Sequence, residues 1–145
     1  MQARLAAALT AGSERVAAWA DLLDEINVFP VADGDTGRNL KLSLAPLINA
    51  HGSTADRCRR LISAGTGNSG NIAAAFLSGF LPALDAQPFD RAASAGRDAA
   101  WSAVADPKPG TMLSLFDALD DALRGWPGMP DGQDAERVIH VLDRA

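Results

Sequence analysis

Two aspartates stand one residue apart in a glycine-containing turn, and their side chains could bind a metal ion. The segment VFPVADGDTGRNL places Asp33 and Asp35 on either side of Gly34, directly before a stretch with helical spacing. We call residues 33–35 the DGD turn. Two carboxylates this close raise each other's pKa in a dry site unless a cation lies between them. Mg²⁺ suits such a pair because it binds few protein oxygens and keeps water or phosphate oxygens as its other ligands. Thr36 and Asn39 would add neutral polar groups at the mouth of the following helix.

The DGD turn also has a simpler structural interpretation. An aspartate in front of a helix commonly accepts hydrogen bonds from the free backbone N–H groups of the first helical turn. On spacing alone this capping role is the more common one, so both interpretations stay open at this point. An EF-hand calcium loop is excluded, because Leu44 stands at the twelfth position, where that loop requires an acidic residue.

A second turn, GTGNSGNI at residues 65–72, places three glycines, Asn68 and Ser69 directly before another helical stretch. We call residues 67–70 the GNSG turn. Free N–H groups at a helix N-terminus can hold phosphate without a lysine, because the helix dipole favours negative charge there. The segment is not a Walker A loop, since no GK[ST] follows. Its alternative role is a glycine-rich connection in which Ser69 is a simple N-cap.

A third turn, DPKPGTML at residues 106–113, leads through Gly110 and Thr111 into a helix. We call residues 108–111 the KPGT turn. Lys108 could reach a phosphate, although a surface lysine between prolines is usually only solvated. Met112 belongs to a helical apolar stripe, which favours a core position over contact with a nucleotide base.

Helices must position these three turns, because apolar residues recur mostly at intervals of three and four along the chain. The pattern predicts helices that begin at Ser13, near residue 37, at Thr54, at Asn68 or Ser69, at Asp90, at Met112 and at Asp134. Inward-facing stripes are predicted at Val16, Trp19, Ala20, Leu23 and Ile26; at Leu40, Leu44, Leu47 and Ile48; at Cys58, Leu61 and Ile62; at Ile72, Ala75, Phe76, Leu77 and Phe80; at Ala93, Ala100, Trp101 and Val104; and at Met112, Leu115, Phe116, Leu119 and Leu123. The prolines and glycines of WPGMPD, residues 126–131, predict a loop.

Composition limits the class of protein. The chain has 145 residues, of which 48% are hydrophobic, and this favours one domain over residues 1–145 with a core of its own. The net charge of −5 and the scattered Lys and Arg argue against a nucleic-acid partner. Cys58 is the one cysteine, and no apolar run of about twenty residues occurs, so we expect a cytoplasmic protein without a membrane span.

Taken in order, INVFPVADGDTGRNL, GTGNSGNIAAAFLSGF and KPGTMLSLFDAL resemble the nucleotide-binding domain shared by dihydroxyacetone kinases and bacterial fatty-acid kinases. The NVFPV lead-in and the GNSG turn are more similar to the fatty-acid kinase branch, and the match spans most of the chain. Three motifs in the family's order are far more specific than any one of them. The resemblance therefore favours the ligand-binding interpretation of the turns over the purely structural one.

The resemblance implies an all-α, antiparallel barrel or bundle of about seven to eight amphipathic helices that binds ATP or ADP at one end. It implies that Asp33 and Asp35 hold two Mg²⁺ ions. The dihydroxyacetone kinase branch has a third aspartate where this sequence has Val28, and Asn27 is the nearest polar substitute. The other nucleotide-binding positions implied are Thr36, Gly37, Arg38, Asn39, Asn68, Ser69, Gly70, Gly110, Thr111 and Met112.

The implied reaction is transfer of the γ-phosphate of ATP to an acceptor that a partner protein presents. A fatty-acid carboxylate is already ionised at neutral pH and needs no general base, which agrees with the absence of a recognisable one. We therefore expect no catalytic residue beyond the metal cluster. The alternatives are the ATP-binding subunit of a dihydroxyacetone kinase and a noncatalytic nucleotide-binding or regulatory module.

The sequence departs from the family pattern at its end. Family members continue past a segment like ERVIHVLDRA into a glycine-rich turn and a final helix, whereas this sequence stops at Ala145. The resemblance thus implies either an excised or shortened domain, or a degenerate member that no longer turns over, and in each case the final helix is missing. The apolar faces of its first and last helices would then be uncovered, and we expect them to support association with another chain, including a second copy.

Overall fold

The computed structural model describes residues 3–28, 31–48 and 51–124, and this part of the chain is helical without a strand. The all-α prediction is therefore confirmed. The elements are α1 (Ala3–Ala18), α2 (Ala20–Glu25), α3 (Thr36–Leu44), the 3-10 helix η1 (Ala45–Leu47), α4 (Thr54–Ala64), α5 (Gly67–Leu84), α6 (Phe89–Ser102) and α7 (Met112–Leu123). No helix within these ranges combines the length and the apolar character that a membrane span requires.

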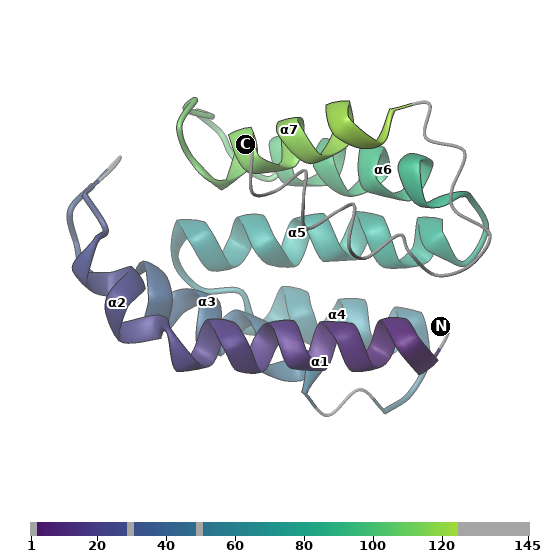
Figure 1. Ribbon diagram of the computed structural model, residues 1–145, viewed down its shortest axis with the longest axis horizontal. Coiled ribbons are helices and arrows are strands. Elements are labelled where there is room, and N and C mark those ends of the chain that lie inside the picture. Colours follow the sequence, from purple (N-terminus) through teal and green to yellow (C-terminus); the bar gives the residue numbers. More distant parts are fainter. Residues whose placement is uncertain (1–2, 29–30, 49–50, 125–145) are drawn as a thin grey trace.

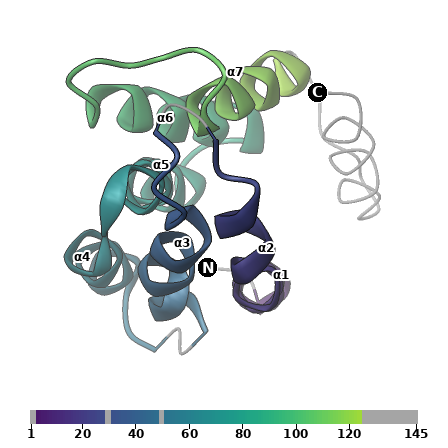
Figure 2. The same cartoon turned by 90° about the vertical axis from the view of Figure 1, so that its left-hand side faces the viewer.

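Helix α5 is the centre of the bundle. Helices α3 and α4 pack on one side of it and α6 packs on the other, while α7 lies mainly against α6 (Figure 1). Helices α1 and α2 pack against α3 and form the outer part of the first side (Figure 2). The helix that carries the GNSG turn at its start is thus enclosed by the helices that flank the other two turns.

The sequence of α5 explains its central position. All five residues of the stripe that the sequence predicts are buried: Ile72, Ala75, Phe76, Leu77 and Phe80. Ala73, Ala74 and Leu81 are buried as well. The Phe76 ring stacks on Phe116 of α7 with 4.0 Å between ring centroids. At the crossing with α6 a Cβ on Gly96 would lie 2.9 Å from Phe76, so only glycine lets the two helices approach this closely.

Several predicted helix starts are wrong by one or more residues. Ser13 does not begin a helix, because it lies inside α1, where its hydroxyl donates to the Leu9 carbonyl oxygen at 2.8 Å. The N-cap of α4 is Ser53 rather than Thr54, and Ser53 and Asp56 form a reciprocal capping box. Helix α6 begins at Phe89, one residue before Asp90, and ends at Ser102, well before Pro107.

Some predicted inward positions are exposed. Trp19 is 52% exposed and Ile26 60% exposed; Trp19 separates α1 from α2, and Ile26 follows the end of α2, whose buried residue is Ala20. Ile62 on α4 is 57% exposed, whereas the neighbouring Leu61 is fully buried. The predicted helix from Asp134 and the predicted loop WPGMPD lie outside the described residues.

Candidate functional site

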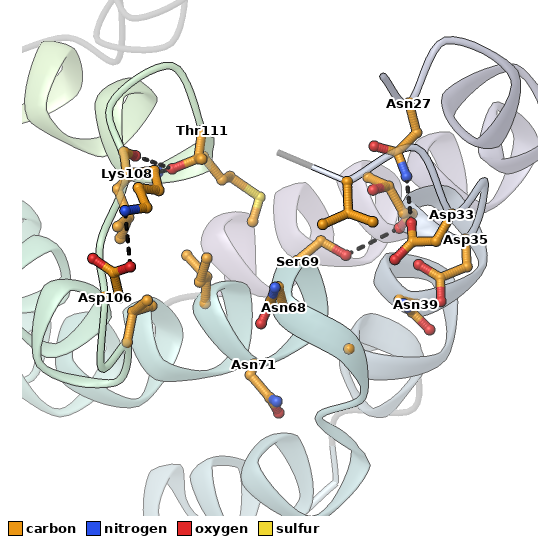
Figure 3. Close-up of a pocket in the computed structure, with 17 residues that line it drawn as sticks. Asn27, Asp33, Asp35, Asn39, Asn68, Ser69, Asn71, Asp106, Lys108 and Thr111 are labelled. Carbon is orange, nitrogen blue, oxygen red and sulfur yellow. Dashed lines mark hydrogen bonds and ion pairs between the residues drawn. The ribbon is translucent and has the colours of Figure 1, made fainter. Parts of the chain in front are cut away.

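The three turns converge on one cavity of about 540 Å³. It lies at the starts of α3 and α5, next to the connection from α6 to α7 (Figure 3). Its lining residues come from three separate segments of the chain: Asn27, Val31, Asp33, Asp35, Thr36 and Asn39; Gly67, Asn68, Ser69, Asn71 and Ile72; and Val104, Asp106, Lys108, Thr111, Met112 and Leu113. Residues more than 70 positions apart in the sequence therefore face the same space.

The DGD turn and Asn27 together form one wall of the cavity, and the carboxylates of Asp33 and Asp35 make this wall acidic. Asn27 donates from Nδ2 to Asp33 Oδ1 at 2.7 Å and so fixes one carboxylate oxygen (Figure 3). Asp35 occupies the N-cap position of α3, but its side chain makes no capping hydrogen bond. The capping interpretation is therefore wrong for Asp35. Both carboxylates line the cavity, and Asp33 also accepts the bond from Asn27.

The cap of α3 comes from a residue of α2. Asp24 Oδ1 accepts hydrogen bonds from the backbone N–H groups of Gly37, at 2.6 Å, and of Arg38, at 3.1 Å. This pair of bonds satisfies donors at the start of α3 that a helix cannot satisfy by itself. Because Asp24 takes over this role, the carboxylate of Asp35 stays available to a ligand.

The GNSG turn is held against α3 by close backbone approaches. Gly67 has a φ of +61°, and a Cβ there would lie 2.0 Å from Asn39 Nδ2. A side chain at residue 67 would therefore be strained and would collide with the neighbouring wall. Ser69 donates from its hydroxyl to the Thr36 carbonyl oxygen at 3.2 Å, which joins the first turn of α5 to the first turn of α3.

The start of α5 differs from the prediction. The helix begins at Gly67 with Thr66 at the N-cap position, and no side chain caps it. Asn68 and Ser69, which the sequence predicts as alternative caps, lie instead in the first helical turn. Neither one closes the N-terminus, and both line the cavity.

The KPGT turn forms the opposite wall. Thr111 is the N-cap of α7 and accepts from the Leu113 N–H at 3.3 Å, while its hydroxyl donates to the Lys108 carbonyl oxygen at 2.9 Å. Lys108 Nζ lies 2.8 Å from Asp106 Oδ2, and both side chains line the cavity (Figure 3). Figure 3 shows this ion pair across the cavity from Asp33 and Asp35.

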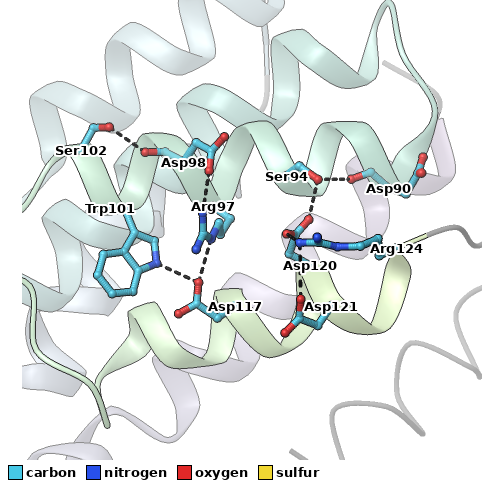
Figure 4. A network of polar contacts seen from close by, with 10 residues as sticks. All are labelled: Asp90, Ser94, Arg97, Asp98, Trp101, Ser102, Asp117, Asp120, Asp121 and Arg124. Atoms are coloured by element: carbon cyan, nitrogen blue, oxygen red, sulfur yellow. Dashed lines mark hydrogen bonds and ion pairs between the residues drawn. The ribbon is translucent and has the colours of Figure 1, made fainter.

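A polar network between α6 and α7 fixes the helices on either side of the KPGT turn (Figure 4). Asp117 Oδ1 accepts from Arg97 Nε at 2.7 Å and from Trp101 Nε1 at 2.9 Å. Asp117, followed by Asp98, raises the pKa of Arg97 above its usual value. These contacts join α6, which precedes the turn, to α7, which follows it.

A second part of the network surrounds Asp120, which is 6% exposed. Burial alone would raise the pKa of this carboxyl. Its hydrogen bond from Ser94 and its ion pair with Arg124 at 2.9 Å outweigh burial and hold the pKa below the usual value (Figure 4). Asp120 is thus a charged group that α6 and α7 share.

The structure brings together nine of the thirteen predicted site residues. Those that line the cavity are Asn27, Asp33, Asp35, Thr36, Asn39, Asn68, Ser69, Thr111 and Met112. The four that do not line it are Gly37, Arg38, Gly70 and Gly110. Gly37 and Gly70 are buried between helices, where a Cβ would lie 2.0 Å from Ala20 O and from Ser43 Oγ respectively. Their role in this structure is close packing, and the N–H groups of Gly37 and Arg38 are taken by Asp24.

Other lining residues are missing from the prediction. They are Val31, Gly67, Asn71, Ile72, Val104, Asp106 and Leu113, together with Lys108, for which the solvated alternative is favoured by sequence alone. Asp106 could have been found from its position two residues before Lys108. The apolar ones carry no signal in the sequence, because they are indistinguishable from core residues until the helices are placed.

The charge of the cavity is suited to a metal ion rather than to a bare anion. Its described lining contains three carboxylates, Asp33, Asp35 and Asp106, and one ammonium, Lys108, so acidic groups are in excess. No group of three or more His, Cys, Asp or Glu side chains suited to a metal occurs among the described residues. The oxygen donors along the acidic wall are the carboxylates of Asp33 and Asp35 with the side-chain oxygens of Asn27, Thr36 and Asn39, and oxygen donors of this kind are the ones that Mg²⁺ prefers.

Comparison with known proteins gives relatives but no family. No protein-family model matches the sequence. The chain is similar to an uncharacterized protein of Staphylococcus saprophyticus, with 33% identity over 152 residues that cover 92% of this chain and 27% of that protein. It is also similar to protein YloV of Bacillus subtilis, with 33% identity over 124 residues that cover 74% of this chain and 22% of YloV. The chain thus spans about a quarter of the length of these relatives.

Proposed function

We propose that this chain is the Mg²⁺–nucleotide-binding part of a kinase, of the type shared by fatty-acid and dihydroxyacetone kinases. The observation that carries the proposal is the convergence of the DGD, GNSG and KPGT turns on one cavity. These are the same three motifs on which the family resemblance rests. A purely structural role for each turn would not require them to face a common space.

The electrostatics of the cavity support a ligand that brings its own metal. A nucleoside triphosphate is strongly anionic and would be repelled by the excess of carboxylates around the cavity. One Mg²⁺ bound by Asp33 and Asp35 would neutralise the charge of that wall, and a second ion would make it positive and offset part of the phosphate charge. The proposal therefore predicts that nucleotide binding depends on the metal, and two ions are expected from the resemblance.

Each wall of the cavity supplies a different kind of contact. The first turns of α3 and α5 offer Thr36, Asn39, Asn68 and Ser69 as polar partners for phosphate, next to the positive ends of two helix dipoles. Met112 and Leu113, with Val104, offer an apolar surface on the opposite side that suits a base. The phosphate groups would thus lie between the Asp33–Asp35 wall and the KPGT turn, and the base against Met112, Leu113 and Val104.

The proposed reaction is transfer of the γ-phosphate of ATP to a carboxylate, which forms an acyl phosphate. A carboxylate oxygen of the acceptor forms a bond to the γ-phosphorus, and the bond from that phosphorus to the oxygen bridging it to the β-phosphate breaks, so that ADP leaves. No proton moves, because the acceptor is already ionised. The chain's own residues would hold and orient the triphosphate and stabilise the charge on its oxygens.

The acceptor is proposed to arrive on another protein or on another part of a longer polypeptide. Most of the groups that line the cavity are already assigned above to the nucleotide and its metal. The relatives are also about four times as long as the matched segment. A fatty-acid-binding protein is the leading candidate for the partner, and a dihydroxyacetone-binding protein is the alternative. A noncatalytic nucleotide-binding module would share the cavity but would not transfer phosphate.

Isothermal titration with ADP and a non-hydrolysable ATP analogue, with and without Mg²⁺, tests the binding part of the proposal. We expect binding only with Mg²⁺, and a loss of at least tenfold in affinity in the double variant Asp33→Asn with Asp35→Asn. Glu25→Gln is the matched control, because Glu25 is exposed on α2 and does not line the cavity. Equal affinity in all three proteins would remove the role of the metal.

Phosphate transfer from labelled ATP separates the candidate functions. Acyl phosphate formation with a fatty-acid-binding partner would support the leading proposal. Phosphorylation of dihydroxyacetone with its own binding protein would favour the second kinase. Metal-dependent nucleotide binding without transfer to either acceptor would favour a noncatalytic module.

A further inference from the structure

Lys108 has a firmly positioned backbone at the edge of the cavity. Pro107 and Pro109 lock φ on both sides of it, and a residue before proline is restricted to extended conformations. The Lys108 carbonyl oxygen accepts from the Thr111 hydroxyl at 2.9 Å, and the Gly110 N–H donates to Ser114 Oγ at 2.9 Å. The lysine is therefore presented from a base that is joined to the first turn of α7, rather than from a loose surface loop.

Lys108 is also the one cationic side chain among the described residues that line the cavity. Its ammonium group pairs with the carboxylate of Asp106, two residues earlier, at 2.8 Å. The Lys108 side chain is 52% exposed and the Asp106 side chain is 79% exposed. An ion pair this exposed contributes little to stability, so the ammonium can change partners at small cost. The acidic wall would hold a metal, and Lys108 lies across the cavity from that wall (Figure 3).

We propose that Lys108 is the cationic contact for the phosphate groups of the ligand, and that Asp106 is its counter-ion until the ligand binds. The inference rests on the proposed function, since it takes a nucleotide as the ligand. When a phosphate enters, the ammonium exchanges the Asp106 carboxylate for a phosphate oxygen while the backbone stays in place. Asp106 therefore competes with the ligand for Lys108 and weakens nucleotide binding.

This arrangement makes a prediction that a structural role for Lys108 does not make. The contribution of Lys108 to affinity must grow with the negative charge of the ligand, so it is largest for ATP, smaller for ADP and absent for adenosine. A lysine that only holds the KPGT turn in shape would affect all three ligands alike, because each would need the same cavity.

The test is isothermal titration of Mg²⁺ complexes of ADP and of a non-hydrolysable ATP analogue, with adenosine as the uncharged probe. Lys108→Ala should weaken binding of the ATP analogue about tenfold, as expected for loss of a charge-assisted hydrogen bond, and should leave adenosine binding unchanged. Lys108→Arg should retain most of the affinity. Asp106→Asn should tighten ATP-analogue binding severalfold, because it frees the ammonium group.

Lys41→Ala is the matched control, since Lys41 is an exposed lysine of α3 that does not line the cavity. It should bind all three ligands like the wild type. Thermal denaturation of every variant identifies loss of fold, and Asp106→Asn keeps the inference testable if Lys108→Ala proves unstable.

The possible failures are distinguishable. If the wild type binds the Mg²⁺–nucleotides and Lys108→Ala binds them equally well, the inference is wrong and the proposed function stands. Equal losses for adenosine and the ATP analogue, or unchanged affinity in Asp106→Asn, would also contradict it. If the wild type binds no Mg²⁺–nucleotide, both the inference and the proposed function are wrong.

Discussion

The carboxylate of Asp24 closes the N-terminus of α3 by accepting from the Gly37 N–H at 2.6 Å. This contact joins the end of α2 to the start of the helix that follows the DGD turn. It supplies the capping hydrogen bond that was one predicted role of Asp35, whose side chain makes no such bond. The candidate site therefore depends on an aspartate that does not line the cavity.

Replacing Asp24 by alanine should destabilise the protein by about 1 to 2 kcal/mol, the usual cost of losing a helix cap. The Gly37 and Arg38 amides would lose their acceptor, and Asp35 would become the nearest carboxylate able to replace it. Chemical denaturation measures the change. Asp21→Ala, an exposed aspartate on the same helix, is the control and should change stability by less than about 0.5 kcal/mol. Equal stabilities of the two variants would show that the Asp24 cap is unimportant.

The close contact between α3 and α2 is tested by two glycine-to-alanine substitutions. A Cβ on Gly37 would lie 2.0 Å from the Ala20 carbonyl oxygen, whereas a Cβ on Gly12 in α1 would meet nothing within 4 Å. We expect Gly37→Ala to cost about 2 kcal/mol or more, because the backbones must move apart. Gly12→Ala should instead stabilise the protein by about 0.5 to 1 kcal/mol, since alanine is the better helix former. Similar melting temperatures for both variants would contradict the packing described above.

The α6–α7 network predicts a dependence of stability on acidic pH. The pKa of Asp120 is below its usual 3.8 in the folded protein, because the bonds from Ser94 and Arg124 outweigh the effect of burial. The unfolded chain therefore binds a proton at Asp120 before the folded protein does. The stability that the charged group contributes is present above about pH 3.8 and is lost as the pH falls through the lower folded-state pKa.

Denaturation at several values of pH below 4 measures this effect. Asp120→Asn should show a smaller loss of stability over that range than the wild type, and Ser94→Ala should show an intermediate loss. Ser102→Ala is the matched control, because it removes an exposed hydroxyl from α6, the helix that also carries Ser94. An unaltered pH profile in Asp120→Asn would contradict the role given to this carboxylate.

The sequence predicts the helices better than their ends, for physical reasons. The stripe of Phe76, Leu77 and Phe80 is readable because burial of one helix face requires apolar residues at intervals of three and four. Caps are harder to predict, since several neighbouring residues can accept the same N–H groups. Ser13 has the right chemistry for a cap but bonds to Leu9 inside a longer helix.

The candidate site was predictable in its polar turns and not in the contacts that support them. Asp33, Asp35, Asn68 and Ser69 stand out because glycines surround them. Asp24 could not be identified, because its partners are 13 and 14 residues away and the start of its helix is misplaced by the apolar pattern. The requirement for glycine at residue 67 likewise follows only from its approach to Asn39.

Whether the three distant turns bind one nucleotide is tested by amide chemical shifts measured during titration with Mg²⁺ and ADP. We expect the amide signals of Asn39, Ser69 and Met112, one from each of the three segments that line the cavity, to shift together and to saturate with one dissociation constant. The amide of Arg59, on the exposed face of α4, should not move. Shifts confined to one turn, different dissociation constants at the three walls, or no shift at any of them would contradict the claim.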